Sequence, residues 1–195
     1  MRKINIIELS LDELEKFCLE MGLKSFKAKQ IWNWLYCFGQ TNFQEMTNLD
    51  KKTRSLLQDS SFIYRPTINK IHKSDDGTLK WLLELSDKSL IETVFIPQGN
   101  RGTICISSQV GCTLNCSFCF TGTQKLVRNL SAADIVGQVL VVRDDLDEWP
   151  KNGIPKHSKR QISNIVMMGM GEPLYNYNAV RDALHIVMDN EGIAL

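Results

Sequence analysis

Apolar residues recur at helical spacing over the first sixty positions of the chain. Ser10 and Glu13 form a capping-box pattern before the first such stretch, which predicts a helix from about residue 11 to 21. The same spacing predicts a second helix that ends before Gly39 and a third over residues 50–58. We therefore expect a small helical domain over residues 1–62.

From residue 67 the period changes, and apolar residues gather in short runs typical of strands. The runs 79–85 and 90–96 are separated by Asp87 and Lys88, and a turn of Asp75, Asp76 and Gly77 precedes the first of them. Residues 63–100 are thus predicted to form a β-hairpin or meander.

Strands and helices alternate after residue 100. Residues 103–107 and 162–168 are predicted strands, and helices are expected over about 132–146, capped by Ser131, and about 177–189. A linker holds Pro150, Gly153 and Pro155. This order predicts an α/β fold with a parallel sheet, whose ligands gather at the C-terminal ends of strands. Two such units should leave strand edges exposed, so we expect residues 101–195 to be a core that is incomplete at its C-terminus.

The composition excludes few classes of protein or partner. Lys and Arg number 23 against 22 Asp and Glu, so a net charge of +1 neither predicts nor excludes a nucleic-acid partner. No apolar run approaches the roughly 20 residues that cross a bilayer, and the first residues lack a signal-peptide pattern. We expect no membrane association and a cytoplasmic protein. In that reducing compartment the six cysteines are predicted to be ligands, nucleophiles or core residues.

Three of the cysteines form a tight group with the spacing C-x3-C-x2-C, at Cys112, Cys116 and Cys119. Three thiolates on one loop can bind three irons of a [4Fe–4S] cluster and leave the fourth iron open for another ligand. The alternative is a zinc site built on Cys116 and Cys119. It would need two further ligands, and neither His157 nor the remaining cysteines offer a matching pair.

A second signal follows the predicted strand at residues 162–168. Gly169, Gly171 and Glu172 lie in a short loop before Pro173. Glycines let a backbone approach a ligand closely, and a carboxylate accepts hydrogen bonds from an ammonium group. Such a loop suits the methionyl amine of S-adenosylmethionine (SAM), although taken alone it would more often be an ordinary strand-to-helix connection.

Together these two signals resemble the radical SAM superfamily. There an aromatic residue precedes the third cluster cysteine, as Phe118 does here, and packs near the adenine of SAM. The glycine–glutamate–proline loop is similar to the superfamily's second motif. The resemblance implies a partial (βα) barrel that uses the cluster and SAM to generate a 5′-deoxyadenosyl radical.

The resemblance extends to one family and to nearly the whole chain. The segments 105–124, 129–138, 27–35 and 168–176 are similar, in order, to the radical SAM dual-specificity adenine-C2 methyltransferases. Those enzymes methylate 23S rRNA and tRNA, so the resemblance implies both RNAs and an electron donor as partners. It also implies an RNA-binding role for the helical domain.

The resemblance also implies roles for two further residues. Cys105 matches the thiol that helps to resolve the enzyme–RNA adduct, and Glu92 matches the proton acceptor. From pattern alone, Cys105 would be a small buried strand residue and Glu92 the polar side of a half-buried strand. Both are candidate catalytic residues.

The family's mechanism uses a methyl-carrying cysteine near the C-terminus, and no cysteine follows Cys119 here. We expect the chain alone to be unable to methylate RNA. Two alternatives stay open at this point. One is the related adenine-C8 methylation of rRNA, and the other is a non-catalytic protein that binds zinc or RNA.

Overall fold

The computed structural model describes residues 3–150 and 160–195. Its N-terminal part is a helical module in which two short parallel strands bring the ends together. The module contains β1 (Ile4–Asn5), η1 (Ile6–Glu8), α1 (Leu11–Glu20), α2 (Phe26–Tyr36), η2 (Phe43–Glu45), α3 (Lys51–Ser60) and β2 (Ser61–Phe62). The predicted capping box at Ser10 and Glu13 is present at the start of α1.

A five-stranded sheet follows, with the strand order β3-β4-β5-β6-β9. The first four strands form an antiparallel meander, and β9 then pairs with β6 in parallel. Their bounds are β3 (Thr67–Lys73), β4 (Leu79–Glu84), β5 (Leu90–Gln98), β6 (Arg101–Cys105) and β9 (Ile162–Val166). The sheet therefore runs without interruption across residue 100, and the division of the chain at residues 62 and 100 stays a prediction.

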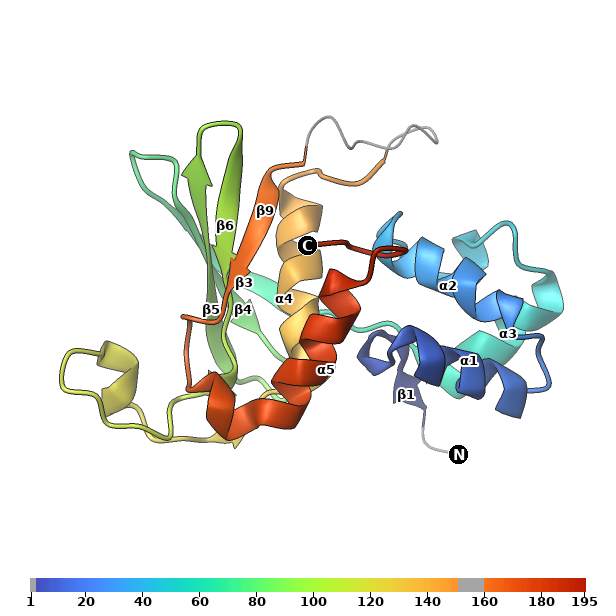
Figure 1. Cartoon of the computed structure of the whole chain (residues 1–195), viewed down its shortest axis with the longest axis horizontal. Helices are drawn as coiled ribbons and strands as arrows, with labels where there is room; N and C mark the ends of the chain where they lie inside the picture. The colour runs from blue at the N-terminus through green and yellow to red at the C-terminus, as the bar shows by residue number, and fades with distance from the viewer. Residues whose placement is uncertain (1–2, 151–159) are drawn as a thin grey trace.

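Two helices cover one face of this sheet, α4 (Ala132–Asp145) and α5 (Tyr177–Met188) (Figure 1). The indole of Trp81 in β4 donates to Asp145 at 3.0 Å, and Thr93 in β5 donates to Gln138 at 2.9 Å. Both partners belong to α4, so the buried positions of β4 and β5 face the helices. The other face carries no helix in the described part of the chain (Figure 1).

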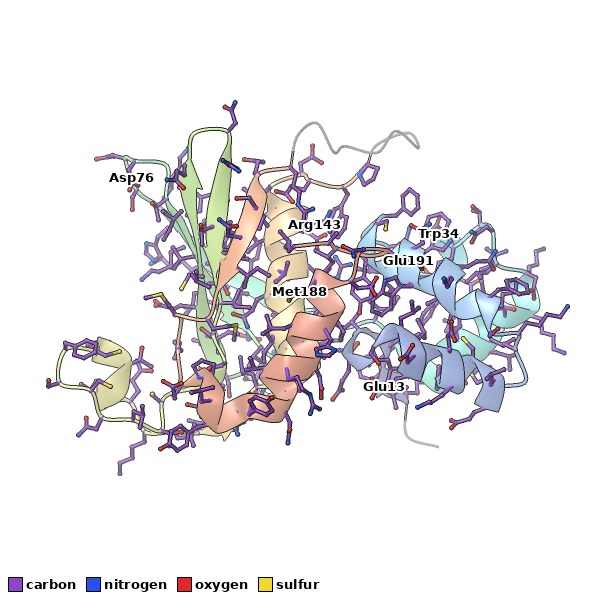
Figure 2. The ribbon with its side chains drawn as sticks, viewed as in Figure 1. Glu13, Trp34, Asp76, Arg143, Met188 and Glu191 are labelled. Carbon is purple, nitrogen blue, oxygen red and sulfur yellow. The ribbon has the colours of Figure 1, made fainter. Side chains whose placement is uncertain are left out.

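The helical module packs against the far side of α4 and α5 (Figure 1). Arg143, near the end of α4, donates to the carbonyl oxygen of Tyr36 at 3.1 Å. Glu191, which follows α5, forms an ion pair with Lys29 of α2 at 3.1 Å. Figure 2 shows Glu191 beside α2. Contacts from α4 and from the segment after α5 thus hold α2 against the core.

The predicted elements are confirmed, with shifts at strand ends; the strand expected over residues 103–107 begins at Arg101. The strand expected to reach residue 107 ends at Cys105, because the Ser107 N–H turns to the side chain of Gln138. The strand expected to reach residue 168 ends at Val166, where the chain folds over residues 106–108. Two residues of the predicted linker, Gly153 and Pro155, lie outside the described residues. So does His157, which was considered as a zinc ligand.

Several short elements near the loops have no clear sequence signal. They are β7 (Gln109–Val110), η3 (Phe120–Thr123), β8 (Arg128–Asn129) and η5 (Pro173–Asn176). β7 and β8 pair with each other and close the base of the cysteine loop. None of the helices in the described residues combines the length and apolar character that a membrane crossing requires.

Candidate cluster and cofactor site

The two loops singled out in the sequence leave the same edge of the sheet. β6 and β9 are parallel neighbours, so the cysteine loop after β6 and the glycine-rich loop after β9 begin side by side. Backbone hydrogen bonds join them. Ser108 donates to the carbonyl oxygen of Met170 at 2.8 Å, and Gly169 donates to that of Ile106 at 3.1 Å. The expectation that both loops lie at C-terminal strand ends is confirmed.

Gln109 is the centre of this junction. Its side chain is fully buried and its Oε1 accepts the backbone N–H of Glu172 at 3.0 Å. Its Nε2 donates to Thr113 at 2.9 Å and to Asn129 at 2.8 Å. One amide therefore holds the start of the cysteine loop, its return strand and the glycine-rich loop together.

Close packing explains the glycine in the second loop. Gly171 has φ +95°, and a Cβ there would lie 2.5 Å from Cβ of Gln109. A side chain at this position would be strained and would push the two loops apart. The adjacent Glu172 is half-buried, and its Oε1 accepts the Leu174 N–H at 3.1 Å, which caps η5.

The base of the cysteine loop is equally constrained. Gly111 has φ +76°, and a Cβ there would lie 2.1 Å from the carbonyl oxygen of Lys125. Beyond this base the loop is open to solvent, and the ring of Phe118 is 91% exposed. The predicted contact of Phe118 with the adenine of SAM stays a prediction.

The three cysteines are free thiols of intermediate exposure on this loop. Backbone N–H groups of Gly122 and Thr121 lower the pKa of Cys119, and the Leu114 N–H donates to Sγ of Cys112 at 3.4 Å. The lowered pKa favours the thiolate of Cys119, the form that iron and zinc bind. The donor set therefore fits a thiolate-ligated cluster. Within the described residues, however, no three His, Cys, Asp or Glu side chains are gathered as metal ligands.

Glu92 and Cys105 lie on the uncovered face of the sheet, near the start of both loops. Cys105 pairs with Val94 across β5 and β6, so Glu92 occupies the diagonal position on the same face. Burial raises the pKa of the Cys105 thiol, and a hydrogen bond from the Met168 backbone opposes this.

Glu92 is held at two points. Its carboxylate forms an ion pair with Lys80 at 2.9 Å, and its carbonyl oxygen accepts the Ser107 hydroxyl at 2.6 Å. Ser107 also accepts the Met170 N–H at 3.0 Å, so the glycine-rich loop is linked to the Glu92 backbone through one hydroxyl.

The sequence interpretation missed Gln109, Ser107 and Gln138, which carry these connections. Each is fully buried. The available signal was a polar residue within an otherwise apolar stretch: Gln138 follows Ile135, Val136 and Gly137 in α4. Because a buried amide or hydroxyl has to find hydrogen-bond partners, such positions indicate contacts even where the partner is unknown.

Comparison with known proteins agrees with this arrangement. Residues 4–63 match the family model for the ribosomal RNA large subunit methyltransferase N-terminal domain. The chain is 54% identical to the dual-specificity RNA methyltransferase RlmN of Paracoccus denitrificans, over 98% of this chain and 50% of the relative. It is 52% identical to the RlmN of Ruegeria sp., over 99% of this chain and 50% of the relative.

The chain matches the N-terminal half of RlmN proteins. It spans about half the length of the RlmN proteins that it matches, and corresponds to their N-terminal part. A solved radical SAM methyltransferase from Sphaerobacter thermophilus superposes with a TM-score of 0.84 and 36% identity, over 97% of this chain and 53% of that one. The predicted fold class, part of a radical SAM barrel preceded by a helical module and a meander, is thus confirmed.

Proposed function

We propose that this chain is the cluster-binding and SAM-binding part of a radical SAM RNA methyltransferase that methylates C2 of adenine in 23S rRNA and tRNA. The supporting observation is the buried junction at Gln109, which holds the cysteine loop and the glycine-rich loop at one sheet edge. The names of the RlmN relatives support the substrate class.

In this proposal Cys112, Cys116 and Cys119 hold a [4Fe–4S] cluster. When bound, such a cluster with one open iron supplies the electron for reductive cleavage of SAM. Gly171 lets the backbone approach the methionyl part of SAM, and Glu172 accepts hydrogen bonds from its ammonium group. The ring of Phe118 is exposed, which leaves it available to pack on the adenine.

The roles of Glu92 and Cys105 follow from their position on the uncovered face. Glu92 would accept the proton that leaves adenine C2. The Cys105 thiolate would attack the sulfur of the thioether that joins the RNA to the methyl-carrying cysteine of the complete enzyme, so that the S–C bond breaks, a disulfide forms and the released carbon takes up a proton to become the methyl group. The target adenine has to be unstacked to reach them, as in other enzymes that act on a nucleobase.

The remaining partners belong to the same proposal. The helical module binds RNA, and a separate electron donor reduces the cluster. We assign this activity to the cytoplasm.

The cofactor assignment is tested on the anaerobically reconstituted chain. We expect about four irons and four labile sulfides per chain, and an electron paramagnetic resonance (EPR) signal that changes when SAM is added. Ala at any of the three loop cysteines should abolish the cluster. The matched control is Cys37→Ala, which removes a half-buried free thiol outside the loop. Stoichiometric zinc without sulfide, or a cluster that ignores SAM, would contradict the proposal.

The substrate assignment is tested in cells. RNA from a strain that lacks the gene is digested and its nucleosides are separated by liquid chromatography and mass spectrometry. We expect 2-methyladenosine to disappear from 23S rRNA and tRNA. Loss of 8-methyladenosine, or no change, would contradict the C2 assignment.

A further inference from the structure

The uncovered face of the sheet, here called the open face, carries positive charge beside the candidate site. Side chains alternate along each strand, and Trp81 and Thr93 point to α4. Their neighbours Lys80, Glu92 and Val94 therefore lie on the open face. The strand register extends this face from Cys105 through β5 and β4 to the edge strand β3.

The register places two lysines in line with the candidate catalytic residues. Lys80 pairs with Val94, which pairs with Cys105, so Lys80 lies in the row of Cys105. Lys70 pairs with Leu82, and Leu82 pairs with Glu92. Neighbouring strands are about 4.8 Å apart. Lys70 thus lies two strands, or about 10 Å, from Glu92, with the Lys80 strand between them.

The strand register places three cations on this face, Lys70, Lys80 and Arg101, and two carboxylates, so positive charge exceeds negative charge. Its two carboxylates, Glu92 and Glu84, are already paired with Lys80 and Lys88. Lys70 is exposed and makes no ion pair with any residue in the described ranges. An unpaired ammonium next to a site that acts on RNA is suited to a phosphate group.

We propose that Lys70 and Lys80 bind the phosphate backbone of the RNA next to the target adenine. This inference rests on the proposed function, because it takes the open face near Cys105 and Glu92 as the place where the base reacts. A phosphate at Lys80 competes with Glu92 for the same ammonium. RNA binding therefore releases the Glu92 carboxylate to accept a proton only when substrate is present.

The competing explanation is that lysines on an edge strand only prevent association with other strands. β3 supplies a matched control for this. Lys73 is an exposed lysine on the same strand, but it pairs with Leu79 and lies on the opposite face from Lys70. A lysine that only protects the edge can point to either face of the sheet. A lysine that binds the RNA in this proposal has to point to the open face.

The experiment measures binding of a fluorescent single-stranded RNA to the full chain by anisotropy, over a series of salt concentrations. Each lost phosphate contact should reduce the slope of log K against log salt by about 0.7, which is about fivefold weaker binding at 0.1 M salt. We expect this for Lys70→Ala and for Lys80→Ala, and twice the change in slope for the double variant. Lys70→Arg should keep the slope, and Lys73→Ala should bind as the unaltered chain does.

Circular dichroism of each variant shows whether it is folded. The proposal is overturned if Lys73→Ala weakens binding as much as Lys70→Ala, if Lys70→Ala keeps the original slope, or if the chain binds no RNA. It is also overturned if polyglutamate binds with the same dependence on Lys70, because the face would then accept any polyanion. The EPR response to SAM is a separate measurement, so this inference can fail while the proposed function stands.

Discussion

The two ends of the parallel strand pair are built differently. At the start of β9, the carboxylate of Glu148 is 1% exposed and accepts the N–H groups of Gln161 and Ile162, each at 2.8 Å. It also pairs with Arg143 at 3.4 Å, and burial lowers the pKa of that guanidinium to about 10. At the other end, the candidate site is joined by the neutral amide and hydroxyl groups of Gln109 and Ser107.

The comparison suggests that one end of the strand pair mainly stabilises the fold, whereas the other end forms the candidate site. Hydrogen bonds to buried charges are roughly twice as strong as neutral ones, and a buried charge that loses its partner is costly. The Glu148 side chain therefore holds the start of β9 against Arg143 of α4. The end with Gln109 brings two loops together by weaker bonds and leaves the cysteines partly exposed.

The largest effect on stability is expected at the start of β9, where Glu148 lies. Glu148→Ala leaves two N–H groups and the Arg143 charge without their partner, so we expect a loss of about 3–5 kcal/mol in the free energy of unfolding. Urea unfolding measures it. Glu148→Gln keeps an oxygen for the two N–H groups and should lose less. The separation of roles would be wrong if Glu148→Ala abolished cluster binding in chains that remain folded.

A smaller loss of stability, with a larger functional effect, is expected for Gln109→Ala. It leaves buried backbone and side-chain groups unpaired, which costs about 1–3 kcal/mol. Because the two loops lose their link, the EPR signal should stop responding to SAM even if some cluster is bound. Urea unfolding and EPR spectra of the same sample test both parts. An unchanged SAM response would show that Gln109 does not couple the loops.

Substitution of Gly171 isolates the close contact between the loops. Gly171→Ala combines a positive φ with a clash against Gln109, and we expect it to cost about 2 kcal/mol. The matched control is Gly22→Ala, where φ is +71° but no atom lies within 4 Å of the added Cβ. That change should cost about 1 kcal/mol and leave the response to SAM intact. Equal costs from urea unfolding would mean that packing adds nothing at Gly171.

The smallest effect concerns the thiols themselves. In the metal-free chain the pKa of Cys119 is lowered by backbone N–H groups, whereas that of Cys105 is raised by burial. A lower pKa means more thiolate at a given pH, so Cys119 should be alkylated faster than Cys105 near neutral pH. As the pH rises, its rate should also reach a plateau earlier. Iodoacetamide labelling followed by peptide mass spectrometry measures both rates, and the reverse order would contradict the structure.

Much of the fold could be predicted because local signals agree with it. The capping residues Ser10 and Ser131 and the turn at Asp75–Gly77 mark their elements directly in the sequence. The continuity of the sheet through β5 and β6 could not be predicted, because strand pairing depends on partners that local patterns do not specify. The early end of β6 has the same cause, since Gln138 lies far along the chain.

For the candidate site, the sequence indicated the residue types with distinctive spacing but not their supports. The three loop cysteines and Gly171 are marked by motifs. Gln109 and Lys80 are not, because an amide or a lysine on a strand has many ordinary explanations. Gln109 is distinguished by its burial, and Lys80 by its cross-strand register and its ion pair with Glu92. Both properties exist only in the folded chain.

The pairing of β6 with β9 also sets an order of folding events. The meander from β3 to β6 joins strands that are adjacent in sequence, whereas β6 reaches β9 only across the cysteine loop and α4. Closing a long loop costs more entropy than closing a short one, so the parallel pair should form last. Until then the cysteine loop has no neighbouring glycine-rich loop. The backbone hydrogen bonds that fix the base of the cysteine loop against the glycine-rich loop are therefore completed only in this last step.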